Sequence, residues 1–157
     1  MITFVIASSF VCCKSKIAEA DKLDLSTAPT QRVLDVFAFQ TSNGEVEMRI
    51  EADVMEHYST DDLDYDYFPE GLAVYGYTEE GLLESVILAD EALHSIPKLK
   101  GGEVVENWKA YGNVVLHNVL KQSTMETDTI YWDQEKKEVY TDCYVKLYTP
   151  DGMMQGT

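Results

Sequence analysis

Apolar and polar residues alternate along most of the chain after residue 32. Successive side chains of a β-strand point to opposite faces, so this alternation predicts strands that each have one apolar and one polar face. The clearest case alternates four apolar residues with four charged ones, namely Val46, Met48, Ile50 and Ala52 with Glu45, Glu47, Arg49 and Glu51. Helical periodicity is hard to find anywhere in this part of the sequence, which predicts an all-β protein.

Short polar segments that contain glycine, proline or clustered charges separate the predicted strands. Ser42-Asn43-Gly44 is the strongest of these hairpin signals, because asparagine followed by glycine readily adopts the positive backbone φ angles of a two-residue turn. The other signals are Glu80-Gly81, Lys100-Gly101-Gly102, residues 133–138 and Pro150-Asp151-Gly152. Together these turns predict a series of stacked hairpins.

A pattern of glycine, alternating strand and Ala-Asp occurs twice, from Gly44 to Asp53 and again from Gly81 to Asp90. Shorter copies end at Thr127-Asp128 and at Thr141-Asp142. A small alanine or threonine fits where a strand turns a corner, and an aspartate can accept backbone N–H hydrogen bonds at such a bend. We therefore interpret the repeat as structural and expect no catalytic role for these aspartates.

Hairpins stacked in register would form one twisted, open β-jelly roll over residues 33–157, with an apolar interior trough. The alternation indicates which side chains face the trough. These residues are Val46, Met48, Ile50, Leu83, Ile87, Trp108, Val114, Leu116, Ile130, Val145 and Leu147. For each of them, the alternative is an ordinary position in a filled β-sandwich core.

Composition limits the possible partners. A chain of 157 residues is long enough for one domain with a sizeable core. Its 45% hydrophobic content, with ten tyrosines, argues against disorder. With 28 acidic and 12 basic residues, the net charge of −16 would repel nucleic acid and anionic lipid surfaces.

Residues 1–13 form an uncharged apolar segment, which is too short for a membrane-spanning helix of roughly 20 residues. The segment is typical of the apolar part of a secretory signal, with Cys13 as the lipid-modified residue and Cys12 as the small residue before it. The alternative is an amino-terminal strand with two buried thiols. Residues 14–32 are polar and would form a tether, while Cys143 is expected in a strand as a small core residue.

Two groups of residues invite a metal-binding interpretation. Asp62, Asp64 and Asp66 have the spacing that opens a calcium loop, but Tyr67 occupies the position of its glycine, and no glutamate stands at the position of its bidentate ligand. A solvated acidic hairpin tip is the preferred interpretation.

The three histidines, His57, His94 and His117, have no partner at the spacing of zinc ligands. His57 and His94 each follow a repeat aspartate by four residues, which indicates a shared structural position. No serine or cysteine nucleophile has a base nearby in sequence. We expect no metal, no cofactor and no enzymatic activity.

Five segments together resemble the LptC-type proteins of lipopolysaccharide export, within the wider OstA-like group and its Bacteroidetes branch. These segments are RIEAD (residues 49–53), YFPEGLAVYGY (67–77), LAD followed by Ala92, WKAYGNVVLHN (108–118) and TDTIYWDQEKKEVYTD (127–142). The resemblance covers residues 33–157. Members of the family usually continue through a further strand, so the domain is expected to be truncated at its carboxyl end.

The resemblance implies a periplasmic jelly roll anchored at the inner membrane. Such a protein receives lipopolysaccharide from an ABC transporter and passes it to a periplasmic bridge protein. Because lipid A is itself phosphorylated, a protein with a charge of −16 would hold its acyl chains rather than its headgroup. The alternative is a periplasmic or surface β-sandwich lipoprotein that binds carbohydrate or protein through its tyrosines.

The two ends of the predicted sheet are apolar and unprotected by lysine. These edges contain Val36, Phe37 and Phe39 in the first strand, and Met153 and Met154 in the last. Exposed strand edges can pair with a partner's strand. By the resemblance, the first edge would meet the transporter permeases and the last edge the bridge protein. The alternative is that the tether or the missing terminal strand covers the edge.

Overall fold

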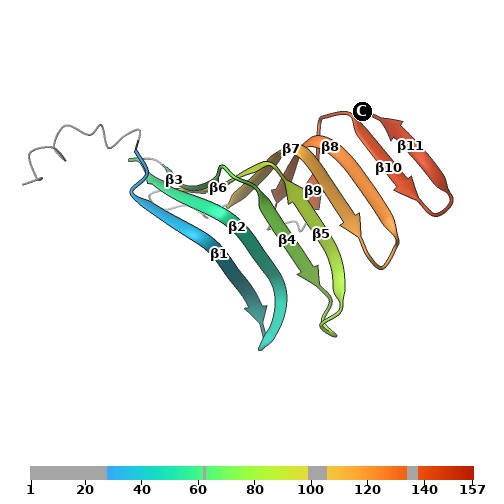
Figure 1. Ribbon diagram of the computed structural model, residues 1–157, viewed down its shortest axis with the longest axis horizontal. Helices are drawn as coiled ribbons and strands as arrows, with labels where there is room; N and C mark the ends of the chain where they lie inside the picture. The colour runs from blue at the N-terminus through green and yellow to red at the C-terminus, as the bar shows by residue number, and fades with distance from the viewer. Residues whose placement is uncertain (1–27, 62, 99–105, 134–137) are drawn as a thin grey trace, which may run out of the picture.

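The computed structural model describes residues 28–61, 63–98, 106–133 and 138–157, and within these ranges the protein is all-β without a helix. Eleven antiparallel strands form one sheet (Figure 1). In chain order they are β1 (Gln31–Ser42), β2 (Glu45–Ser59), β3 (Leu63–Phe68), β4 (Leu72–Tyr77), β5 (Leu83–Ala89), β6 (Glu91–Pro97), β7 (Asn107–Asn118), β8 (Ser123–Asp133), β9 (Glu138–Tyr140), β10 (Val145–Thr149) and β11 (Gly152–Gly156). The all-β prediction is confirmed.

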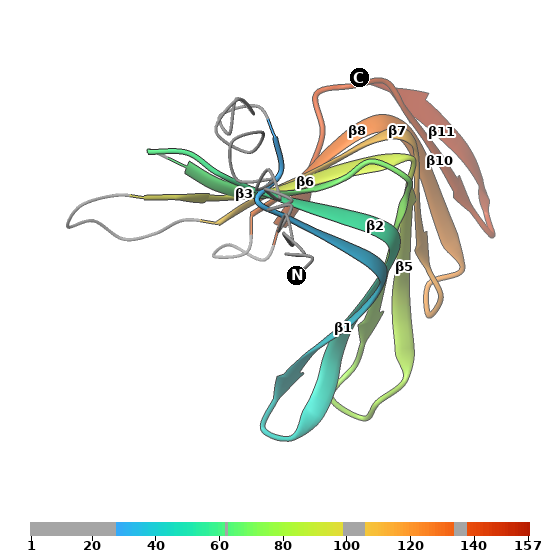
Figure 2. The same cartoon turned by 60° about the vertical axis from the view of Figure 1, so that its left-hand side comes forward.

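The sheet folds into two layers because its long strands change partners along their length. Residues 48–51 of β2 pair with β4, and residues 56–59 pair with β3. In β7, residues 107–111 pair with β6 and residues 115–118 with β5. We call the layer around β4, β5, β10 and β11 the lower layer and the layer around β3, β6 and β9 the upper layer; Figure 2 shows the two diverging from a common corner.

A line of bends forms this corner, and the repeat aspartates lie on it as predicted. The residues of this corner row are Asp35, Asp53, Asp90, Asn113, Asp128 and Asp142. Asp35 and Asn113 have φ angles of 51° and 47°, in the left-handed region that asparagine and aspartate tolerate best. Each long strand therefore turns where its sequence permits the turn.

Hydrogen bonds at the corner differ from the expected pattern. The carboxylate of Asp90 accepts a bond from the Asn113 side chain at 2.6 Å, and the Asp90 backbone N–H donates to the carbonyl of Gly112 at 2.9 Å. At the β9–β10 bend, the backbone N–H of Cys143 donates to the hydroxyl of Thr141 at 3.0 Å. The threonine, rather than the repeat aspartate, is the acceptor at this bend.

The small residues of the repeat face the core, as predicted. Ala52 and Ala89 pack against it, and Thr127 is buried with its hydroxyl donating to the carbonyl of Tyr144 at 3.0 Å. The core lies inside the corner, between the two layers. Its buried residues are Phe68, Leu72, Ala92, Ala110, Val114 and Ile130.

Several local predictions need correction. Cys143 lies in the bend between β9 and β10, half-buried, rather than inside a strand. Asp64 and Asp66 belong to β3 rather than to a solvated hairpin tip, because the turn comes before Leu63. The first strand extends from Gln31 to Ser42 and so includes the last two residues of the tether that is predicted over residues 14–32.

Three predicted hairpin turns are confirmed. Asn43 and Gly44 both have positive φ angles, 51° and 90°, between β1 and β2, and Gly81 and Pro150-Asp151 lie in the β4–β5 and β10–β11 connections. The predicted turns at 100–102 and 134–137 lie outside the described residues. So do Cys12, Cys13 and nearly all of the predicted tether.

Gly112 provides a test of the corner. A Cβ atom there would lie 2.9 Å from the Cβ of Asp90, at a φ of 75°. We expect Gly112→Ala to destabilise the protein by about 1–3 kcal/mol, measured as the free energy of unfolding in urea. The control Gly156→Ala adds a Cβ that meets nothing within 4 Å and should change stability by less than about 0.5 kcal/mol. Equal effects of the two substitutions would contradict this account of the corner.

Candidate functional site

One apolar row crosses the inner face of the lower layer from edge to edge. Its eight residues are direct partners across eight strands: Ala38, Ile50, Val74, Ile87, Leu116, Met125, Leu147 and Met154. We call this set the apolar row. Side chains that are paired across neighbouring strands lie on the same face, so the row forms a continuous apolar stripe along the inside of the fold.

The opposite face of the same strands is polar near β2, as the alternation predicted. Arg49 points away from the apolar row, where its guanidinium lies 3.1 Å from the carboxylate of Glu51 and 4.1 Å from the ring centre of Tyr75. It also lies 5.9 Å from the ring centre of Phe37. The predicted apolar and polar faces of β2 are therefore confirmed.

An open cleft of about 980 Å³ lies between the layers, near the upper end of the range of ligand pockets, about 300–1,000 Å³. Val46, Met48, Val74 and Ile87 line its lower side, and Trp132 and Val139 its upper side; polar residues of the β1–β2 and β4–β5 hairpins line its mouth. Toward the corner the space narrows to a pocket of about 30 Å³, lined almost entirely by apolar residues. The interior is thus filled at the corner and open at the mouth.

The predicted trough residues divide into four groups by position. Val46, Met48 and Ile87 line the open cleft, while Ile50, Trp108 and Ile130 line its narrow end. Val114 is only 1% exposed and belongs to the filled core. The remaining four, Leu83, Leu116, Val145 and Leu147, are half-buried and lie outside the cleft lining.

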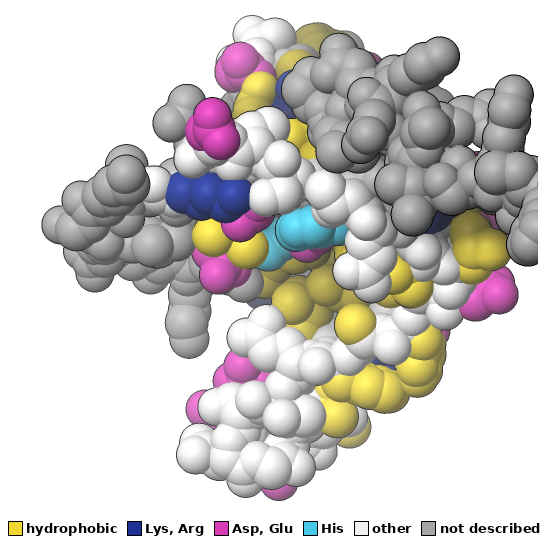
Figure 3. Space-filling view, turned by 90° about the vertical axis from the view of Figure 1, so that its left-hand side faces the viewer, with side chains coloured by type: hydrophobic (Ala, Val, Ile, Leu, Met, Phe, Trp, Pro, Cys, Tyr) yellow, Lys and Arg dark blue, Asp and Glu magenta, His cyan; other side chains and the backbone are white. Residues whose placement is uncertain are grey.

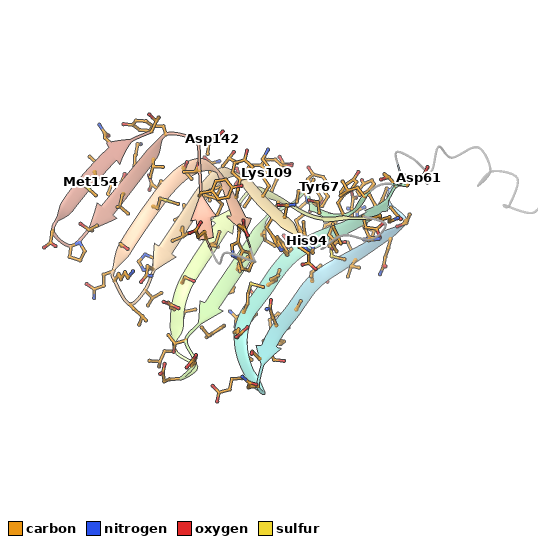
Figure 4. All side chains as sticks on the ribbon, turned by 180° about the vertical axis from the view of Figure 1, so that it is seen from behind. Asp61, Tyr67, His94, Lys109, Asp142 and Met154 are labelled. Carbon is orange, nitrogen blue, oxygen red and sulfur yellow. The ribbon has the colours of Figure 1, made fainter. Side chains whose placement is uncertain are left out.

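The inner face of the upper layer changes from polar to aromatic along one row. In strand order from β2 to β9, this row contains His57, Asp66, His94, Trp108, Trp132 and Val139. In Figure 4, His94 lies on the inner side of the upper layer, whereas Tyr67 and Lys109 lie on its outer side. The row therefore forms the roof of the trough, opposite the apolar row.

The polar part of this roof is a histidine–carboxylate cluster that we call the polar wall. The two oxygens of Asp66 lie 2.7 Å from Nδ1 of His57 and 3.4 Å from Nδ1 of His94. Nε2 of His94 lies 3.2 Å from an oxygen of Glu106, and the His94 ring stacks on Trp108 with ring centres 4.2 Å apart. The cluster joins β2, β3, β6 and the start of β7.

Sequence reasoning placed His57 and His94 at equivalent positions but missed their common partner. The alternating aspartates of β3 contained the missing signal, because Asp66 pairs with His57 on one side and His94 on the other in the sheet register. Beside the cluster, the Lys98 ammonium lies 2.8 Å from the carboxylate of Asp64. Charged groups of both signs thus face this end of the interior.

The hydrogen bond with His94, and then that with His57, holds the pKa of the Asp66 carboxyl below its usual value of 3.8, although desolvation opposes the shift. On the outer face, the hydrogen bond from Tyr67 to Glu91 and partial burial raise the pKa of the Tyr67 hydroxyl. The inner cluster thus favours the ionised form of its carboxylate.

The outer face of the upper layer carries six of the ten tyrosines. They are Tyr58, Tyr65, Tyr67, Tyr111, Tyr131 and Tyr140. Their rings largely contact one another: Tyr58 stacks on Tyr65 with ring centres 4.8 Å apart, and Tyr131 stacks on Tyr140 at 5.3 Å. Lys109 lies between Tyr111 and Tyr131.

Both ends of the lower layer are edges. β1 pairs only with β2, and β11 only with β10, among the described strands. Phe37 and Phe39 of β1 are 58% and 54% exposed on the outer face, while Met154 of β11 is 65% exposed on the inner face. Val36 faces inward beside Ala52, and Met153 faces outward beside Tyr148.

No protein-family model and no curated protein matches this chain. Within the described residues, no helix has the length and apolar character to cross a membrane. Among the same residues, no three histidine, cysteine, aspartate or glutamate side chains are arranged to hold a metal ion.

The shifted Asp66 carboxyl generates a pH prediction. Because its folded-state pKa is below the unfolded value of 3.8, ionised Asp66 contributes stability above that value, and the contribution is lost as the pH falls through the folded-state pKa. Asp66→Asn should lower the free energy of unfolding at pH 7 by about 1.5–2 kcal/mol, the lower part of the range for hydrogen bonds to a charged group, since the side chain is 23% exposed.

Urea unfolding at pH 7, 5 and 3 checks this prediction. The difference between wild type and Asp66→Asn should be similar at pH 7 and 5 and smaller at pH 3. The exposed Asp61 supplies the control, since Asp61→Asn should have little effect at any of these pH values. A wild-type advantage that is the same at pH 3 as at pH 7 would show that the charge of Asp66 is not involved.

Proposed function

We propose that this protein is a non-enzymatic carrier that holds the acyl chains of lipopolysaccharide against the apolar row. The observation that carries the proposal is the uninterrupted apolar row, two of whose members, Val74 and Ile87, line an open cleft. A filled β-sandwich would bury such a row completely. Here the space beside Met48 and Ile87 remains open. Figure 3 shows hydrophobic side chains on the hollowed face of the molecule.

Apolar burial is a sufficient driving force for this binding. Each methylene group transferred from water to an apolar surface contributes about 0.8 kcal/mol, and a lipid with several acyl chains contains dozens of them. The protein's net charge of −16 disfavours a grip on the lipid A phosphates. Chain binding inside the trough, with the phosphates outside, is consistent with both facts.

The shape of the open end supports transfer of the lipid to a partner. The apolar row continues through Leu147 on β10 to Met154 on β11, beyond β9, which pairs with β8 at the end of the upper layer. β11 contains no charged residue, although charge is a common protection of sheet edges. An added strand from a periplasmic bridge protein would extend the row there.

The opposite edge is proposed to meet the ABC transporter permeases. Val36 and Ala38 lie on the inner face of β1, and the apolar row begins at Ala38. A lipid could therefore enter here from a trough on the transporter. The proposal places the protein in the periplasm, tethered to the inner membrane through residues 1–32 or through a lipid on Cys13. The resemblance of residues 33–157 to LptC-type proteins supports this placement.

Photo-crosslinking in the native host tests the trough. A benzophenone amino acid at Met48 or Ile87, which line the cleft, should form adducts with lipopolysaccharide. The same amino acid at Phe37 or Leu88, which point outward and are 58% and 45% exposed, should form few. Adducts at the outward positions alone would reject the trough, because a lipid held inside cannot reach them.

A pair of neighbouring methionines tests the open edge. Met154→Lys places a charge at the end of the apolar row, whereas Met153→Lys places the same charge on the outer face of the same strand. Both side chains are more than half exposed, so both variants should fold. In the native host, Met154→Lys should cause lipopolysaccharide to accumulate at the inner membrane, and Met153→Lys should not. Equal export by the two variants would argue against transfer across β11.

A second candidate is a lipoprotein that binds carbohydrate or protein through the outer tyrosines. The row of tyrosine hydroxyls on the upper layer favours it, together with the carboxylates of Glu56 and Glu91 that accept their hydrogen bonds. Tyr140→Ala, at a side chain that is 58% exposed, should weaken binding to a glycan or protein partner in this case. It should leave lipid crosslinking at Met48 unchanged.

A further inference from the structure

The roof of the trough has a polar part and an aromatic part, whereas the apolar row on the opposite layer contains only apolar residues. Along the roof row, the β2, β3 and β6 positions carry His57, Asp66 and His94, and the β7 and β8 positions carry Trp108 and Trp132. The apolar row crosses β2, β4, β5, β7 and β8 on the inner face of the lower layer without a polar residue. In Figure 3, the histidine side chains lie directly beside hydrophobic ones on the hollowed face. The trough therefore has a polar end at β2, β3 and β6 and an apolar end at β7 and β8, which would contact the head and the chains of an amphiphile.

The polar wall offers acceptors rather than positive charge. Among the described residues, the carboxylates of Asp64, Asp66 and Glu106 face it, together with the ammonium of Lys98. Protonation of both histidines would only balance these charges. The described part of the chain therefore offers a phosphate or carboxylate head no excess of positive charge at this end.

The geometry also specifies what the histidines present to a ligand. A carboxylate can only accept, so a neutral His57 donates from Nδ1 to Asp66 and presents Nε2 as an acceptor. The Glu106 carboxylate contacts His94, but its side chain is 41% exposed. Its remaining oxygen lone pairs can therefore accept hydrogen bonds from a ligand. Both free groups suit a head that donates hydrogen bonds.

We propose that the polar wall binds an amine-bearing head of the carried lipid and so orients it along the trough. The ammonium lies against Asp66, Glu106 and Nε2 of His57, while the acyl chains extend past Trp108 and Trp132 over the apolar row toward β11. This inference rests on the proposed lipid-carrying function. It adds that the lipid has a cationic amine in its head, and that the acyl chains point from the polar wall toward β11.

Single-chain amphiphiles that differ only in their head test the inference. Binding of dodecylammonium and of dodecyl phosphate, both below their micelle concentrations, is measured by titration calorimetry at pH 7 with the purified full-length protein. Wild type should bind dodecylammonium about tenfold more tightly, the effect of one hydrogen bond between charged groups. The double variant Asp66→Asn/Glu106→Gln should reduce this preference to less than about threefold.

A control separates the position of the charges from their number. Glu126→Gln/Asp151→Asn removes the same two charges from exposed positions, one on the outer face of β8 and one in the β10–β11 turn. This variant should keep the wild-type preference. If the Asp66 substitution prevents folding, Glu106→Gln alone should still lower the preference, because its side chain lies at the rim of the cluster.

The outcomes distinguish the inference from the function on which it rests. Equal binding of both amphiphiles, tighter binding of dodecyl phosphate, or an unchanged preference in the double variant overturns the polar wall as a head site but leaves a lipid trough. Binding of neither amphiphile removes the proposed carrier function and the inference together.

Discussion

The interior of this protein depends on bends that let one continuous sheet face itself. A flat sheet of eleven strands would expose the apolar row to water; the corner row turns β1, β2, β7 and β8 so that their two halves enclose a common space. Backbone geometry makes the turn possible, with left-handed φ angles at Asp35, Gly112 and Asn113. The contact between Gly112 and Asp90 then fixes the distance between neighbouring bends.

Inside that space, the side chains pack closely near the corner, and the gap between the layers opens farther from it. Near the corner, Phe68, Ala92 and Val114 fill the interior and supply the stability of the fold. Farther out, the same alternation of inward side chains continues, but the layers diverge and the space between them stays open. One sequence pattern thus produces a core at the corner and an open, partly apolar cleft at the mouth, and the difference between the two is geometric.

Much of the fold could be predicted because strand alternation and turn residues are local properties. The apolar face of β2 follows from the two-residue alternation of its side chains. The Asn43-Gly44 turn follows from the preference of these residues for positive φ angles. What could not be predicted depends on strand order. Asp66 meets His57 and His94 only because β3 lies between β2 and β6, and no local pattern specifies that neighbourhood. Val114 and Met48 likewise have the same inward pattern, although one is sealed in the core and the other lines the cleft.

Mass spectrometry of lipids extracted from the protein, after purification from its native host, tests the central claim most directly. The account predicts about one molecule of a multi-acyl lipopolysaccharide-type lipid per protein, because the apolar row would otherwise remain in contact with water beside an open cleft. Protein that is folded but free of such lipid, and that fails to bind added lipid A, would contradict it.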